Sequence, residues 1–94
     1  MYEIYYTNQA KKDYQKLKFS HLKEKLDNLL KILSENPFQT PPPYELLIGD
    51  MSCAISRRIN KQHRLVYQIF PKENAVKILR MWTHYEWLNL STYN

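Results

Sequence analysis

Several residues in the second half of the chain have side chains of the types that cleave RNA by acid–base chemistry. They are a carboxylate, three guanidinium groups and an imidazole: Glu45, Arg57, Arg58, Arg64 and His84. A carboxylate can remove the proton from a ribose 2′-OH, a guanidinium can stabilise charge on the phosphate oxygens, and an imidazolium can protonate the departing 5′ oxygen. A fold that brings these groups together could cleave RNA without a metal ion.

The arginines are concentrated in the segment 55–67, which holds three of the four arginines in the chain. Basic residues elsewhere are nearly all lysines. The planar fork of arginine binds phosphate with two parallel hydrogen bonds, whereas lysine is a mobile point charge. We therefore interpret the segment as a phosphate-binding site.

A short polar break divides this segment into two strand-like halves and predicts a β-hairpin. Two registers of the hairpin are compatible with the sequence. One register places Arg57 opposite Arg64. The other pairs Ile59 with His63, and it places Arg58 opposite Arg64 instead. The residues alone leave both registers open.

Other reactive residue types stand apart from this set. Cys53 is interpreted as a small buried residue, because no histidine is near it in the sequence. His63 is expected at the surface, in the turn of the hairpin, and His21 belongs to a lysine-rich helix. No pair of His or Cys residues has the spacing of metal ligands, and the single glycine excludes a glycine-rich phosphate loop. The sequence therefore predicts neither a metal site nor a cofactor.

The size and charge of the chain limit the class of protein. Its 94 residues, 44% hydrophobic and 24% charged, suit one compact globular domain. The formal net charge of +5 favours an acidic partner, which leaves nucleic acid, an acidic protein and an anionic membrane open. No apolar run reaches the length of a membrane span, the N-terminus lacks the regions of a signal peptide, and a single cysteine suits a reducing compartment. We therefore expect a cytoplasmic protein.

The N-terminal half predicts one strand and two helices. Residues 2–6 are rich in β-formers, and Thr7 or Asn8 can cap the helix that follows. The apolar side of this helix carries Ala10, Tyr14 and Leu17. Ser20 is available to cap the second helix, which ends before Pro37 and whose apolar stripe consists of Leu22, Leu26, Leu29, Leu30 and Leu33. The two helices are expected to be antiparallel and joined by a tight turn.

The C-terminal half predicts an antiparallel sheet. Residues 41–43, all proline, are interpreted as a stiff, extended spacer, with a proline-rich partner motif as the alternative. Strand-like segments follow near residues 46–48, 54–59, 64–70 and 75–82. One strand, a two-helix hairpin and an antiparallel sheet together predict an α+β fold, with the helices on one face of the sheet. The other face would be open and available for binding.

Two motifs of this half resemble the YoeB/Txe family of bacterial toxins, within the RelE-like superfamily. They are the pair His84-Tyr85 and the run Ser56-Arg57-Arg58-Ile59, continued by His63-Arg64-Leu65-Val66-Tyr67. The helical pair and Asn36-Pro37-Phe38 extend the resemblance over nearly the whole chain. It implies a fold like that of the microbial ribonucleases, in a single domain spanning residues 1–94 with 86–94 as a C-terminal extension.

The resemblance also implies an activity and partners. Members of this family cleave messenger RNA in the ribosomal A site without a metal ion and thereby inhibit translation. Their partners are the ribosome, the message and a cognate antitoxin of the YefM/Axe type, whose acidic segment would suit a basic chain. Members also form homodimers, although no residue pattern here defines a two-fold interface.

The resemblance assigns a role to each matching residue. Glu45 matches the general base and His84 the general acid of the family. Arg64 matches the arginine that stabilises the transition state, and Arg58 matches a second arginine near the phosphate. Tyr85 matches the terminal tyrosine that stacks on a base or positions it. Arg57 receives no role.

The chain departs from the family pattern at several positions. The family commonly has a lysine three residues after the glutamate, where this chain has Ile48, and a glycine and an aromatic residue where it has Cys53 and Ile55. Nine residues follow Tyr85, whereas family members commonly end soon after this position. The loss of the lysine at Ile48 supports an alternative function, a catalytically weak or inactive relative that binds RNA or an antitoxin without cleavage, whereas the other differences concern the shape of the pocket and the dimer surface. A role as co-repressor together with the antitoxin is compatible with either function.

Overall fold

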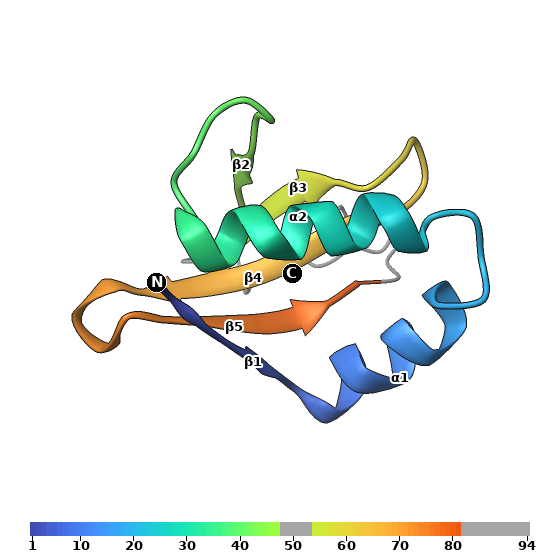
Figure 1. The fold of residues 1–94 in the computed structure, drawn as a ribbon, viewed down its shortest axis with the longest axis horizontal. Coiled ribbons are helices and arrows are strands. Elements are labelled where there is room, and N and C mark those ends of the chain that lie inside the picture. Colours follow the sequence, from blue (N-terminus) through green and yellow to red (C-terminus); the bar gives the residue numbers. More distant parts are fainter. Residues whose placement is uncertain (48–53, 82–94) are drawn as a thin grey trace.

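The computed structural model describes residues 1–47 and 54–81. Its elements follow the predicted order of one strand, two helices and a run of strands (Figure 1). They are β1 (Glu3–Tyr6), α1 (Asn8–Leu17), α2 (Lys23–Glu35), β2 (Glu45–Leu46), β3 (Ile55–Arg58), β4 (Arg64–Phe70), the 3-10 turn η2 (Pro71–Glu73) and β5 (Ala75–Arg80). The strand predicted at 64–70 has the same bounds in the structure. Ile48 and Trp82, at the ends of two other predicted strands, lie outside the described residues.

The strands form one sheet in the order β1-β5-β4-β3-β2. β2 to β5 are antiparallel as predicted, but β1 lies parallel to β5, so the sheet is mixed. The helices carry the chain from β1 at one edge to β2 at the other, and the later strands return it to the side of β1 (Figure 1). The prediction of an antiparallel sheet missed this pairing because it joins the two ends of the described chain, and local sequence carries no signal for it.

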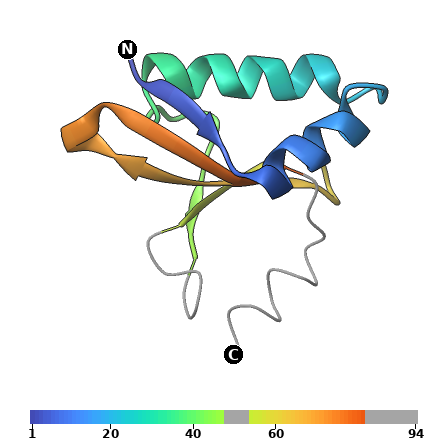
Figure 2. The same ribbon diagram turned by 90° about the horizontal axis from the view of Figure 1, so that it is seen from below.

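Both helices pack on one face of the sheet, and the main core lies between these two layers (Figure 2). α1 and α2 run in opposite directions, as predicted, and they splay apart from the turn that joins them (Figures 1 and 2). The helices contribute Ala10, Leu17, Leu26, Leu29 and Leu33 to the core, and Leu22, just before α2, joins them. The sheet contributes Ile55, Leu65, Tyr67, Val76 and Ile78. The apolar stripes read from the sequence are thus the buried faces of the helices.

The first helix is fixed to the sheet at its N-terminus. Thr7, one of the two predicted candidates, is the cap, and its hydroxyl oxygen accepts the N–H of Ala10 at 3.0 Å. The same hydroxyl donates to the carbonyl of Leu79 in β5 at 3.0 Å. One side chain therefore begins α1 and ties it to the strand that completes the sheet.

The second helix begins later than predicted and ends where predicted. It starts at Lys23, and the hydroxyl of Ser20 accepts the N–H of Leu22 at 3.1 Å in the turn before it, so Ser20 is not its cap. Asn36 ends the helix with an extended backbone, because the proline ring of Pro37 disfavours the helical region for the residue before it.

The proline segment is bent, which corrects the prediction of a stiff, extended spacer. Residues 41 and 42 form a bend, and the peptide bonds that precede Pro41 and Pro42 are cis. The segment still carries the chain from the end of α2 to the edge strand β2.

The face of the sheet away from the helices is partly buried, not open as predicted. Because side chains alternate along a strand, Ser56 and Arg58 lie on this face, while Ile55 and Arg57 lie on the helix face. Arg58 is exposed, but Ser56 and the cross-strand Val66 are buried. A second apolar cluster covers part of this face and consists of Ala54, Val66, Leu47 and Leu79.

Candidate active site

The β3–β4 hairpin adopts the second of the two registers that the sequence allows. Arg58 is the cross-strand partner of Arg64, and the N–H of Ile59 donates to the carbonyl of His63 at 2.9 Å. The side-chain oxygen of Asn60 accepts the N–H of His63 at 2.7 Å, which closes the turn by the local bonding typical of asparagine. This turn therefore places two arginines as neighbours on the face away from the helices.

His63 is buried, so its predicted surface position is wrong. Only 4% of its surface is exposed. The turn made by Asn60 brings the chain back to the sheet at His63, directly before the first residue of β4, Arg64.

Strand β2 brings Glu45 to the arginines. Glu45 pairs with Ser56 in β3, and its carboxylate oxygen Oε1 lies 3.9 Å from Nη1 of Arg64. This separation makes an ion pair and is too long for a hydrogen bond. The Arg64 side chain is only 7% exposed, whereas that of Glu45 is 68% exposed. The guanidinium is thus held in the protein and the carboxylate reaches solvent beside it.

These residues line one pocket of about 310 Å³. Its walls are Pro42, Pro43, Tyr44, Glu45, Ser56, Arg58 and Arg64. The volume is at the lower end of the range for small-molecule sites, which is roughly 300–1,000 Å³. The pocket therefore offers a carboxylate and two guanidinium groups to a ligand of modest size, as phosphate chemistry requires.

A larger pocket, of about 420 Å³, does not carry this chemistry. It lies at the two helices and β1, and it is lined by Tyr6, Lys11, Tyr14, Gln15, Asp27 and Leu30. Its one carboxylate, Asp27, already forms an ion pair with Lys23 at 2.6 Å. We therefore place the candidate site at Glu45 and the arginines.

Ser56 is a pocket residue that the sequence reading did not select. Its hydroxyl is buried and has no hydrogen-bond partner among the described residues. The signal was present, because Ser56 directly precedes the arginine pair and alternation puts it on the same face as Arg58.

Arg57 does not join the pocket. It is fully buried, and its guanidinium Nε donates to the hydroxyl of Tyr67 at 2.8 Å. The side chains of the two consecutive arginines of β3 therefore lie on opposite faces of the sheet.

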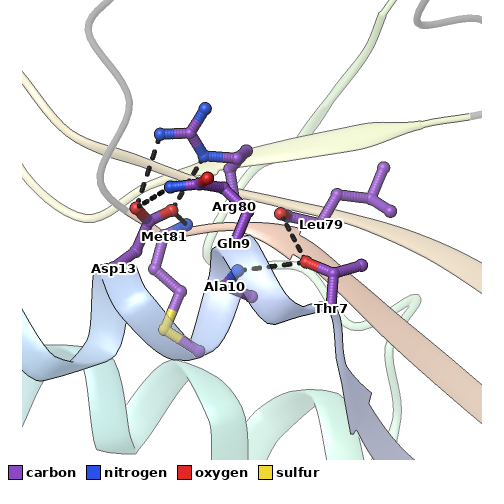
Figure 3. A network of polar contacts seen from close by, with 7 residues as sticks. All are labelled: Thr7, Gln9, Ala10, Asp13, Leu79, Arg80 and Met81. Atoms are coloured by element: carbon purple, nitrogen blue, oxygen red, sulfur yellow. Dashed lines mark hydrogen bonds and ion pairs between the residues drawn. The ribbon is translucent and has the colours of Figure 1, made fainter.

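A buried ion pair holds the end of β5 (Figure 3). Asp13 of α1 is fully buried, and its Oδ2 accepts hydrogen bonds from Nε of Arg80 at 2.8 Å and from the N–H of Met81 at 3.0 Å. Gln9 donates to the other carboxylate oxygen at 3.2 Å. Burial alone raises the pKa of Asp13, but these hydrogen bonds and the Arg80 charge outweigh burial, so that the carboxyl pKa is lowered. Asp13 is thus an ionised anchor for the last described residues.

The sequence reading also missed this anchor. Asp13 interrupts the apolar side of α1 between Ala10 and Leu17, and a carboxylate at such a position is buried only with a partner. Its partner Arg80 was the one arginine outside the hairpin segment. His84 and Tyr85, the remaining predicted site residues, lie outside the described residues, a few positions after Met81.

Within residues 1–47 and 54–81, no group of three His, Cys, Asp or Glu side chains is placed to hold a metal ion. In the same ranges no helix is long and apolar enough to cross a membrane.

Comparison with models of protein families identifies the family of this chain. The model of the YoeB-like toxins of bacterial type II toxin-antitoxin systems matches residues 6–85. The chain belongs to this family. The match includes all residues that line the pocket of Glu45, and it also includes His84 and Tyr85. The resemblance seen in the sequence is therefore confirmed at the level of the family.

Solved structures show that the fold is that of the YoeB-like toxins. A YoeB/ParE toxin from Agrobacterium tumefaciens is 27% identical, with a TM-score of 0.79 and coverage of 88% of this chain and 99% of that chain. A YoeB–YefM complex from Staphylococcus aureus is 31% identical, with a TM-score of 0.76 and coverage of 90% and 99%. YafQ from E. coli, at 19% identity and a TM-score of 0.71 over 88% and 93%, shares the fold. No curated protein sequence matches the chain.

Proposed function

We propose that this chain is the toxin of a toxin–antitoxin pair and that it cleaves messenger RNA in the ribosomal A site, in the cytoplasm, which stops translation. The observation that carries the proposal is the convergence of Glu45, Arg58 and Arg64 on one pocket. Membership of the YoeB-like family supports the toxin role. The chemistry of the pocket supports attack on a phosphodiester.

Glu45 acts as the general base. Its exposed carboxylate takes the proton of the ribose 2′-OH, and the 2′ oxygen forms a bond to the adjacent phosphorus. His84 acts as the general acid and gives a proton to the 5′ oxygen as the bond from phosphorus to that oxygen breaks. The products are a 2′,3′-cyclic phosphate and a free 5′-OH, and nothing is oxidised or reduced.

The arginines stabilise the charge that develops on the phosphate. Arg64 is nearly buried, so its guanidinium is held in place before the substrate arrives, which makes it the better transition-state group. Arg58 is exposed and contacts the phosphate from the outer side of the pocket. Tyr85 stacks on a base of the message. In this scheme guanidinium groups supply the positive charge, and no step needs a metal ion.

The proposed partners follow from charge and from the relatives. One similar structure is a YoeB–YefM complex and another is a YoeB dimer, both from Staphylococcus aureus. A net charge of +5 attracts an acidic antitoxin segment. We propose an antitoxin of the YefM/Axe type as the partner that neutralises this chain, and a homodimer as the form it adopts when free.

Expression of the protein in bacteria tests the function. Wild type should arrest growth, and primer extension on ribosome-bound message should show new ends near the A-site codon. Glu45→Ala and His84→Ala should each lower cleavage by about 100-fold or more, since each removes a proton-transfer group. Glu73→Ala, at an exposed glutamate in η2, is the control and should stay toxic. If folded Glu45→Ala and His84→Ala proteins cleave as fast as wild type, the assigned roles are wrong.

The same experiment separates the alternative function. The family lysine is replaced by Ile48, which favours a module that binds RNA or antitoxin without cleaving. Slowed translation with intact message in the wild type would select this second function, because a bound but uncut message leaves no new ends.

A further inference from the structure

Arg57 makes an unusual set of contacts on the helix side of the sheet. Its guanidinium donates hydrogen bonds to the hydroxyl of Tyr67 and to three backbone carbonyls. The carbonyls are those of Pro37 at 3.0 Å, Gln39 at 2.7 Å and Pro42. A guanidinium has five N–H groups in a fixed plane, and here nearly all of them are used. Arg57 is therefore joined to the chain at several points at once.

The three carbonyls belong to a segment, residues 37–42, that contains neither helix nor strand. Within the described part of the chain, its other hydrogen bonds run to Asn36 or between Gln39 and Pro41. Its prolines have no N–H to pair with a strand. The hydrogen bonds that tie this segment to the sheet thus come from Arg57.

The segment leads directly to Glu45. Tyr44 lies over the guanidinium, with its ring centroid 4.9 Å from Cζ of Arg57, a cation–π distance. The next residue is Glu45, at the start of an edge strand only two residues long. So short a strand cannot fix its own position, because it adds few hydrogen bonds to the sheet. The place of the Glu45 carboxylate beside Arg64 then depends on what precedes it.

We propose that Arg57 is the positioning residue for Glu45. It holds residues 37–44 against the sheet, and this fixes the carboxylate relative to Arg64 across the pocket. The role requires arginine, because one lysine ammonium cannot reach three carbonyls in a plane while it lies under an aromatic ring. The proposal rests on the proposed function only in making Glu45 the base, since the hold on the segment is a property of the free protein.

Hydrogen exchange of backbone amides tests the hold on the segment without RNA. In Arg57→Lys, exchange at Gln39 and Glu45, whose amides lie in a turn and in a strand pair, should rise by roughly tenfold or more relative to the core strands, because the segment opens locally. Val76→Ala truncates a buried β5 residue remote from the segment and is the control for general destabilisation. In this control, exchange should rise in the core and the segment together. Equal increases at the segment and the core in Arg57→Lys would overturn the proposal.

Cleavage of a defined message on ribosomes tests the consequence for Glu45. At saturating enzyme, Arg57→Lys should lower the cleavage rate roughly 10- to 100-fold, the effect of misplacing a catalytic group. Affinity for a message with a 2′-deoxyribose at the cleavage position should change less than about threefold, because Arg58 and Arg64 remain. A loss in affinity equal to the loss in rate would overturn the positioning role. If wild type does not cleave, the proposed function fails. The hydrogen-exchange result still tests whether Arg57 fixes residues 37–44 against the sheet.

A measurement on the unaltered protein covers the case in which Arg57→Lys does not fold. Clamped guanidinium protons exchange slowly and give separate NMR signals, because rotation about Cζ–Nη is blocked. Wild-type Arg57 should show such signals, and exposed Arg58 should show averaged ones. Averaged signals for Arg57 would overturn the proposal.

Discussion

Arg58 lies directly opposite Arg64 across β3 and β4. Like charges in this position repel and destabilise a sheet by roughly 0.2–1 kcal/mol. Arg64 has a carboxylate 3.9 Å away in Glu45, and we find no partner for Arg58 among the described residues. The fold thus tolerates a repulsive pair at the place where an anion would bind.

Replacing Arg58 should separate stability from anion binding. Arg58→Gln removes the repulsion, so the free energy of unfolding should stay level or rise by a few tenths of a kcal/mol, at most about 1 kcal/mol. Inorganic phosphate should raise the Tm of wild type more than that of Arg58→Gln, because binding stabilises only the folded state. Urea unfolding and thermal melts with and without phosphate measure both effects. Equal stabilisation of wild type and Arg58→Gln by phosphate would show that Arg58 is not part of the anion site. Lys72→Gln in η2 removes the same charge elsewhere and is the control.

Loss of the Asp13 anchor should cost far more than loss of a surface pair. Asp13→Asn replaces a fully buried carboxylate, which accepts hydrogen bonds from Arg80, Met81 and Gln9, with a neutral amide, and this should cost about 1.5–3 kcal/mol. Asp27→Asn is the matched control, because it also removes a carboxylate from an ion pair, here the exposed pair with Lys23. This variant should cost much less. Chemical denaturation of the two variants compares them directly. Similar losses would mean that the Asp13–Arg80 pair is no stronger than a surface pair.

The same anchor predicts acid sensitivity. The pKa of Asp13 is lowered in the folded state, so the unfolded chain binds a proton more readily than the folded one. Stability from this group is therefore fully present above the unfolded pKa, about 3.9, and is lost as the pH falls through the folded pKa. Unfolding free energies measured from about pH 6 downward should fall more steeply for wild type than for Asp13→Asn. Parallel curves would contradict the role of Asp13.

Removing the buried hydroxyl of Ser56 should not destabilise the protein. Ser56→Ala deletes a buried polar group that has no hydrogen-bond partner among the described residues, so stability should be unchanged or higher by up to about 2 kcal/mol. Ser20→Ala is the control, because that hydroxyl donates to the carbonyl of Leu17 and accepts the N–H of Leu22, and it should cost about 1 kcal/mol. Thermal melts distinguish the two. A clear loss in Ser56→Ala would reveal a partner for this hydroxyl.

The parts of the fold that depend on local periodicity were predictable. The leucine stripe of α2 and the bounds of β4 follow from side-chain spacing, which one helix or strand contains in full. The parallel pairing of β1 with β5 was not predictable, because it joins residues more than 70 positions apart. The hairpin register depended on whether Asn60 would close the turn, and both outcomes preserve an acceptable strand pattern.

The sequence predicted which residues form the candidate site better than it predicted how they are arranged. The resemblance to the family selected Glu45, Arg58 and Arg64, and the structure brings these three together. Arg57 was left without a role, although alternation with Ile55 and Ile59 already placed it on the core face. Burial of a charge there is acceptable only because carbonyls of a distant segment meet it, and this cannot be read from β3 alone.

The position of β5 between β1 and β4 has a consequence for how the chain is made. A ribosome releases β1 first and β5 last, so the first strand waits without its neighbour until nearly the whole protein has been synthesised. β5, which has a neighbouring strand on both sides, is thus supplied at the end, and the ion pair between Asp13 and Arg80 can form only then. The sheet of a nascent chain therefore stays open between β1 and β4 until β5 has left the ribosome.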